Sequence, residues 1–136
     1  MDRAIEALDQ LLGTWEFTMH HADVSKPIYG RHVYERVLDG AFVLHRCVYD
    51  RSDFPDAMAL MTDTTYHYFD VRGITRIFKV EFKDHGWSTI NVEKEFSQRT
   101  VARFKSREQV EVNGKRSHDN GVTWQPDYTM TSRRVI

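Results

Sequence analysis

Cysteine and long apolar runs are both scarce in this sequence. The single Cys47 cannot form a disulfide within the chain. No run approaches the roughly 20 apolar residues that a helix needs to cross a bilayer. The first residues, with acidic Asp2, lack the apolar stretch of a signal peptide. These absences predict a soluble, cytoplasmic protein with no membrane partner.

Positive charge is not in surplus either. The 19 Lys and Arg residues are balanced by 20 Asp and Glu residues, which gives a net charge of -1. A protein that holds a nucleic-acid backbone needs an excess of positive charge to offset the phosphates. We therefore expect no nucleic-acid partner.

The motifs of common metal, cofactor and hydrolase sites are also missing. The seven histidines form no H-x-H or HExxH pattern, and there is no cysteine pair. No G-x-S-x-G turn, glycine-rich phosphate loop or dinucleotide fingerprint occurs. The sequence thus predicts no metal and no cofactor, and we interpret Cys47 as a small apolar strand residue rather than a nucleophile.

The first residues have the pattern of a short helix. Ile5, Leu8 and Leu12 recur at helical spacing, and Asp2 is placed to cap the first turn. The following stretch, WEFTMH, alternates large apolar and polar side chains. We therefore expect a helix over residues 1–12 that leads directly into a strand.

The rest of the chain, residues 13–136, is expected to be a single all-β domain. Runs rich in β-branched and aromatic residues fit about nine strands. Because the gaps are too short for parallel crossovers, consecutive strands are expected to pair antiparallel. An up-and-down barrel of 8–10 strands would remove the exposed edges of such a sheet. The turn signals are Asp39-Gly40, Pro55-Asp56, Arg72-Gly73, Asp84-His85-Gly86, Asn113-Gly114 and Asn120-Gly121.

Two stretches suggest irregular structure. KPIYG, residues 26–30, is the one segment that fits a longer, lid-like loop. Pro126 lies within the last expected strand, where it predicts a bulge or an unpaired position.

Strand periodicity indicates which side chains face the interior, where a barrel of this size can hold a small molecule. One strand remains ambiguous because both its faces are apolar. Inward Val43, His45, Cys47 and Tyr49 would make His45 a candidate acid or base, whereas the opposite parity would bring Arg46 inside. The expected inward sets elsewhere are Trp15, Phe17 and Met19; Ile74, Arg76, Phe78, Val80 and Phe82; and Phe96, Ala102 and Phe104.

Arg76 is the most informative residue, because its expected neighbours on the inner face are apolar. A buried guanidinium needs a partner, and the anionic head of an apolar ligand would supply one. An internal salt bridge to Glu35 or Asp70 would satisfy it equally, as would a bulge that turns Arg76 to solvent.

Three aromatic rings are concentrated in YHYFD, residues 66–70. Tyr66, Tyr68 and Asp70 share one strand face. The tyrosine hydroxyls could orient a ligand's polar groups, and ordinary aromatic packing of a strand is the alternative.

Gly13-Thr14-Trp15 before the first strand, with Arg133 and Arg134 ending the last, resembles the calycin superfamily of lipocalins and fatty-acid-binding proteins. In those proteins the tryptophan closes one barrel end and a last-strand arginine packs across the indole. The resemblance therefore implies that Trp15, Arg133 and Arg134 are barrel-closing residues, through cation-π attraction and guanidinium stacking.

A longer series of segments resembles an uncharacterised bacterial family of calycin-like barrels. That resemblance implies a fold with a cavity, but no established substrate or reaction. A related branch, the nitrobindin-like proteins, binds haem through a histidine near the C-terminus. Here the last strand has no histidine and His118 lies in a turn, so haem is the lesser alternative. The segments are LLGTW, YERVLDGAFVLHR, YHYFDVRGITRIF, FSQR and SHDNGVTWQPDYTMTSRRV.

Three functions are therefore weighed. The first is binding of a small, largely apolar molecule, with Arg76 and one or more of Tyr68, Tyr128 and His45 fixing its polar end. Phe17 and Phe78 are expected to line the pocket. The second is a cofactor-free cyclase, isomerase or hydratase in which His45 or Glu35 moves a proton. The third is a barrel filled by its own side chains that pairs into a homodimer through an outer face.

Overall fold

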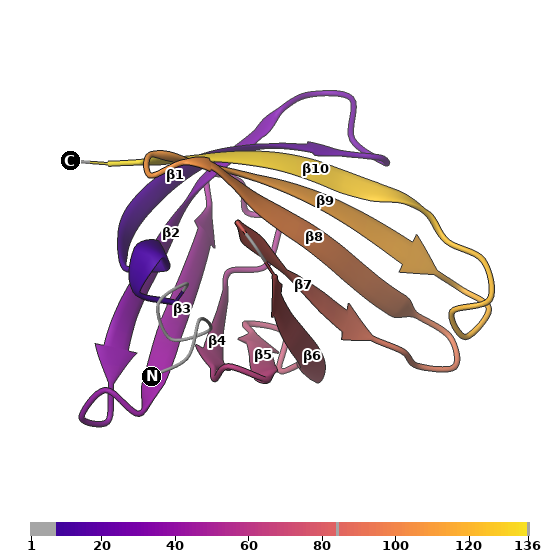
Figure 1. Cartoon of the computed structure of the whole chain (residues 1–136). Coiled ribbons are helices and arrows are strands. Elements are labelled where there is room, and N and C mark those ends of the chain that lie inside the picture. Colours follow the sequence, from indigo (N-terminus) through magenta and orange to yellow (C-terminus); the bar gives the residue numbers. More distant parts are fainter. Residues whose placement is uncertain (1–7, 84, 136) are drawn as a thin grey trace.

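Ten strands follow one another along the chain and close into a single antiparallel barrel (Figure 1). This computed structural model describes residues 8–83 and 85–135. Each strand pairs with its sequence neighbours, and the first also pairs with the last. The expected up-and-down barrel is confirmed. The strands are β1 (Gly13–His21), β2 (Ile28–Val37), β3 (Phe42–Tyr49), β4 (Ala57–Met61), β5 (Thr65–Asp70), β6 (Thr75–Lys83), β7 (Gly86–Asn91), β8 (Ser97–Ser106), β9 (Gln109–Ser117) and β10 (Gln125–Arg134).

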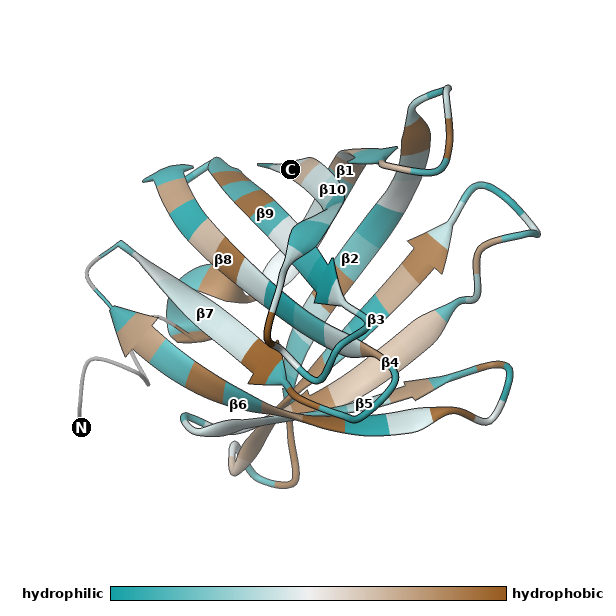
Figure 2. Ribbon diagram, turned by 90° about the vertical axis from the view of Figure 1, so that its right-hand side faces the viewer, coloured by the Kyte–Doolittle hydropathy of each residue, from teal (hydrophilic) through white to brown (hydrophobic). Residues whose placement is uncertain are grey.

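Apolar and polar residues alternate along the strands, as Figure 2 shows for β6 and β8. The alternation places the apolar set inside, because successive side chains of a strand point to opposite faces. The expected inward parity of β1 and β6 is confirmed: Trp15, Phe17 and Met19 are buried, as are Phe78 and Val80. A one-residue slip in either strand would expose its whole apolar set.

The ambiguous strand β3 turns Val43, His45 and Cys47 inward. All three are buried, whereas Arg46 is exposed on the outer surface. There the Arg46 guanidinium lies 3.5 Å from the carboxylate of Glu35 on β2. The first of the two parities considered for residues 41–49 is therefore correct, and Arg46 does not reach the interior.

A short helical segment, residues 8–11, covers the barrel end at which β1 begins. Leu8 and Leu11 are buried in the same apolar cluster as Trp15, Val43 and Trp87. The expected N-cap Asp2 and the apolar Ile5 lie outside the described residues. Within residues 8–83 and 85–135, no helix has the length and apolar character needed to span a bilayer.

Trp15 and Arg134 join this helical segment to the barrel seam. The two residues are opposite one another in the β1–β10 pairing, and the Arg134 guanidinium lies 4.3 Å from the centre of the indole ring. The indole N–H donates to the Leu11 carbonyl at 2.8 Å. Arg134 donates to the carbonyls of Leu12 at 2.6 Å and Gln10 at 2.5 Å. One guanidinium therefore stacks on the tryptophan and satisfies carbonyls at the end of the helical segment.

Two turn expectations were wrong. Asn113-Gly114 lies inside β9, where a Cβ on Gly114 would come within 2.4 Å of the Tyr128 ring. This glycine thus makes room for an aromatic side chain and forms no turn. Residues 28–30 of the expected lid-like loop belong to β2, and a Cβ on Gly30 would collide with the Phe17 ring at 2.2 Å.

Two other local expectations are confirmed near the C-terminus. Asn120 and Gly121 both have positive φ, 61° and 81°, as an Asn-Gly turn requires. The pairing of β10 with β9 shifts between Pro126 and Tyr128, which is the irregularity expected from a proline within a strand.

Replacing Arg134 with methionine should lower the free energy of unfolding by about 2 kcal/mol, because the cation-π contact and the bonds to the helical segment are lost. Urea denaturation followed by tryptophan fluorescence measures the change. The matched control is Arg133→Met, since Arg133 is the exposed neighbour on the outer face. A loss of similar size in both variants would contradict the role given to Arg134.

Candidate functional site

The barrel encloses a cavity of about 410 Å³ above the apolar cluster that covers its helical end. Even-numbered strands run toward that end and odd-numbered strands run away from it. The cavity walls are mostly aromatic and apolar, with a few polar groups, which is the usual make-up of a small-molecule pocket. Five of the predicted site residues line it together: His45, Tyr68, Arg76, Phe78 and Tyr128.

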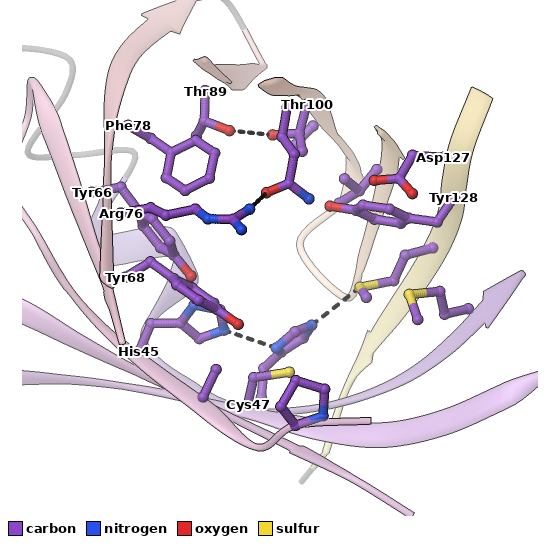
Figure 3. A pocket seen from close by; sticks show the side chains of 18 of the residues that line it. His45, Cys47, Tyr66, Tyr68, Arg76, Phe78, Thr89, Thr100, Asp127 and Tyr128 are labelled. Carbon is purple, nitrogen blue, oxygen red and sulfur yellow. Dashed lines mark hydrogen bonds between the residues drawn. The ribbon is translucent and has the colours of Figure 1, made fainter. Parts of the chain in front are cut away.

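Arg76 extends from β6 into the middle of this cavity (Figure 3). Its Nη1 donates to the side-chain oxygen of Gln98 at 2.9 Å, and its guanidinium lies 4.9 Å from the centre of the Phe96 ring. In the described part of the chain, no carboxylate lies within ion-pair distance of it. Its partners are therefore a neutral amide and an aromatic face.

The two internal salt bridges considered for Arg76 are not formed. Glu35 contacts Arg46 on the outer surface, and the Asp70 carboxylate contacts Arg72 at 2.7 Å. The expected bulge is absent too, because Arg76 pairs with Tyr68 in a regular β5–β6 register. The Arg76 guanidinium thus remains inside the barrel without a counter-charge from the described residues.

The other arginines that line the cavity have carboxylate partners. Arg72 forms an ion pair with Asp70, which balances its positive charge. Arg116 contacts Asp23 through both terminal nitrogens, at 2.6 and 2.9 Å, and lies 3.6 Å from Asp127. Of the three, Arg76 is the one that offers a free positive charge to an occupant of the cavity.

A chain of hydrogen bonds crosses β5, β3, β2 and β10 in the cavity wall (Figure 3). His45 contacts the Tyr66 hydroxyl through Nδ1 at 2.8 Å and Nδ1 of His32 through Nε2 at 2.8 Å. His32 in turn contacts the sulfur of Met130 through Nε2 at 3.2 Å. The Tyr34 ring stacks on His45 with centroids 4.2 Å apart and an interplanar angle of 3°.

Both histidines are held neutral by burial. Desolvation lowers the pKa of His32 to about 4, and it lowers the pKa of His45 well below the ordinary value, with repulsion from His32 as a second cause. Burial also raises the pKa of Tyr66. At neutral pH this chain of hydrogen-bonded side chains therefore carries no charge. Both ring nitrogens of His45 are already hydrogen-bonded, one to Tyr66 and one to His32. His45 has no free nitrogen with which to act as a general base.

His32, Tyr34 and Tyr66 were not among the predicted ligand-contacting residues. A signal for the first two was available, since Ile28, Gly30, His32 and Tyr34 alternate along β2 on one face. Without the pairing of β2 to β1, nothing in the sequence indicates that this face points inward. Tyr66 shares the face of Tyr68, and the parity argument that selected Tyr68 selects Tyr66 equally.

Phe17, Glu35 and Arg133 do not take the positions that the sequence predicted for them. Phe17 faces inward but packs against His32, with centroids 4.6 Å apart, and does not line the cavity. Glu35 is on the outer surface with Arg46, so it has no access to the interior. Arg133 is exposed, and Arg134 alone of the two arginines stacks on Trp15. Strand parity explains the positions of Glu35 and Arg133.

A carboxylate faces the cavity near its open end because of the irregularity in β10. The register shift between Pro126 and Tyr128 lets Asp127 and Tyr128, which are adjacent in sequence, both line the cavity. The Asp127 carboxylate lies 3.3 Å from Nε2 of His21. Nδ1 of His21 accepts a hydrogen bond from the backbone N–H of Asp23 at 3.1 Å. Both ring nitrogens of His21 are therefore engaged.

The remaining nucleophile and haem expectations concern Cys47 and His118. Burial raises the pKa of the Cys47 thiol to about 12, so the reactive thiolate is not populated at neutral pH. His118 packs against Phe96 and does not line the cavity. Since the nitrogens of His32 and His45 are already hydrogen-bonded, the residues present do not fit axial ligation of a haem, and we derive no haem chemistry.

The lowered pKa of His32 predicts a pH-dependent stability. Between pH 6.5 and about 4 the unfolded chain binds more protons than the folded chain, so stability falls as the pH decreases through this window. The full contribution of His32 is about 3 kcal/mol. Urea denaturation at a series of pH values measures it. His32→Leu should reduce the slope, with buried His45 accounting for what remains, whereas His20→Gln, on the exposed side of β1, should leave the slope unchanged. Identical slopes in all three proteins would contradict the assignment.

Comparison with known proteins adds to the description of the fold. No family model and no curated protein matches the sequence. A solved structure of a protein of unknown function from the DUF3598 family of Nostoc punctiforme aligns with a TM-score of 0.63 at 14% identity. The alignment covers 94% of this chain and 49% of the other, so this chain spans about half the length of that protein.

A second solved structure, the S-type phycobiliprotein lyase of Guillardia theta, aligns with a TM-score of 0.62 at 8% identity. It covers 96% of this chain and 92% of the lyase. Identities this low carry information about architecture rather than activity. Together with the closed ten-stranded sheet, the two alignments show that this chain has the same barrel fold as these structures, which is the fold that the resemblance in the sequence implied.

Proposed function

We propose that this protein binds a small, largely apolar anion inside the barrel, with Arg76 as the anchor for its charged end. The observation that carries the proposal is the guanidinium of Arg76, which faces the cavity with only Gln98 and Phe96 as described partners. Arg76 is half-buried. A cation at the wall of a cavity without a counter-charge is available to an anionic ligand, which would bind it through strong, charge-assisted hydrogen bonds.

The volume and the aromatic lining of the cavity support a small, apolar body for this ligand. A volume of about 410 Å³ lies within the usual range of small-molecule pockets. The rings of Tyr66, Phe78, Phe96 and Tyr128 lie along its walls. The phycobiliprotein lyase provides a precedent for a functional protein built on this barrel, although its low identity transfers no substrate.

Binding is favoured over catalysis by the state of the basic groups in the cavity. The three histidines that line the cavity, His21, His32 and His45, each have both ring nitrogens engaged. The Asp127 carboxylate is held in contacts with His21 and Arg116 through its Oδ1 atom. A general base must have a free lone pair within reach of the substrate's proton. Glu35, the other residue considered for catalysis, lies on the outer surface.

Two fluorescent probes with the same ring system test the role of Arg76. 8-Anilinonaphthalene-1-sulfonate carries an anionic group, and N-phenyl-1-naphthylamine is its uncharged counterpart. In Arg76→Gln the dissociation constant for the sulfonate should rise about tenfold or more, because a charge-assisted hydrogen bond is lost. The constant for the neutral amine should stay within about twofold, which fluorescence titration would measure.

The control is Arg46→Gln, which removes an arginine from the outer face of the barrel. It should leave the affinities for both probes unchanged. The proposal would be wrong if Arg76→Gln weakened the two probes equally, or if neither probe bound the wild-type protein.

A further inference from the structure

The direction of the hydrogen bonds in the Tyr66–His45–His32–Met130 chain is fixed by its last member. A thioether sulfur accepts hydrogen bonds and has no proton to donate. Nε2 of His32, 3.2 Å from the Met130 sulfur, must therefore carry the proton, because two lone pairs would otherwise face one another. Since His32 is neutral, its Nδ1 is then an acceptor.

The same reasoning passes along the chain to Tyr66. Nδ1 of His32 accepts from Nε2 of His45 at 2.8 Å, which leaves Nδ1 of His45 as an acceptor. The Tyr66 hydroxyl must then donate to it, at 2.8 Å. With its one proton used in this way, the Tyr66 oxygen offers only lone pairs to the cavity.

The hydroxyl proton of Tyr68 is also used in a hydrogen bond. Its hydroxyl donates to the Asp70 carboxylate at 2.8 Å, so its oxygen also faces an occupant as an acceptor. Tyr68 pairs with Arg76 across the β5–β6 register, and Tyr66 pairs with Phe78 one inward position deeper. The cavity therefore combines one cation that has no carboxylate partner among the described residues, Arg76, with two neighbouring groups that can accept hydrogen bonds but cannot donate them.

The spacing along the strands sets the scale of the ligand. Arg76 and Phe78, and likewise Tyr68 and Tyr66, are two residues apart, which corresponds to about 6.6 Å of strand. Tyr68 is the direct partner of Arg76, whereas Tyr66 is offset from Arg76 by this one step. A single or fused aromatic ring with an anion at one end and a hydrogen-bond donor at the other can span such an offset. The aromatic lining around both positions suits such a flat body.

We infer that the ligand class is a hydroxylated aromatic acid, whose carboxylate contacts Arg76 and whose hydroxyl donates to the oxygen of Tyr66 or Tyr68. This inference rests on the proposed binding function and names the chemistry of its ligand. The carboxylate would supply a counter-charge for the Arg76 guanidinium. The hydroxyl would donate a hydrogen bond to a tyrosine oxygen whose own proton is already used.

A set of three naphthalene acids tests the inference on the wild-type protein. 6-Hydroxy-2-naphthoate has the donor, 6-methoxy-2-naphthoate replaces it with an oxygen that cannot donate, and 2-naphthoate has neither. The hydroxy acid should bind about fivefold or more tightly than both others, as one additional hydrogen bond allows. Binding is measured by isothermal titration calorimetry.

Two further measurements examine the acceptors directly. In Tyr66→Phe/Tyr68→Phe, which keeps both rings, the preference for the hydroxy acid should fall below about twofold while 2-naphthoate binds as before. Long-range 1H–15N correlation spectra of the free wild-type protein should show the proton of both His32 and His45 on Nε2. This second measurement does not depend on the folding of any variant.

The outcomes distinguish a failure of this inference from a failure of the proposed anion-binding function. If all three acids bind with equal affinity, or if His32 carries its proton on Nδ1, the hydroxylated class is wrong and the anion-binding function stands. If none of the three acids binds, the proposed function itself is wrong. A preference for the hydroxy acid that survives in the double variant would also overturn the assignment to these tyrosines.

Discussion

The stacking of Arg134 on Trp15 is the contact on which the architecture depends. A ten-stranded meander has two free edges until its first and last strands meet, and this pair lies in the seam where they do. The same guanidinium also binds carbonyls of the helical segment. Closure of the barrel wall and coverage of its end are thus tied to a single side chain.

The cavity lies beside two buried apolar clusters, one at the helical end and one that contains Phe17, Met19 and Met130. Leu8, Leu11, Trp15, Val43 and Trp87 form a continuous apolar cluster under the helical segment. Beyond it, the inner positions carry aromatic rings and polar groups that satisfy one another through the wall. Of the three arginines that line the cavity, Arg76 is the one without a carboxylate partner among the described residues.

Much of the barrel could be predicted from the sequence, because strand alternation is a local signal. It correctly placed Trp15, Phe17 and Phe78 inside, and it selected Arg76 as the charged residue of the cavity. The parity of residues 41–49 could not be predicted, since both faces of β3 are apolar and only long-range pairing distinguishes them. The Asn113-Gly114 signal failed for a similar reason: Gly114 accommodates the ring of Tyr128, which lies on another strand.

The chain that ends at Met130 has an electrostatic consequence of its own. Its three hydrogen bonds all run in one sense, from the phenol through two imidazoles to the thioether, so their bond dipoles add instead of cancelling. The barrel wall is therefore polarised, and its negative end is the Tyr66 oxygen that faces the cavity. The guanidinium of Arg76 lines the same cavity. The two ends of the proposed ligand site therefore differ in polarity, negative at the Tyr66 oxygen and positive at Arg76.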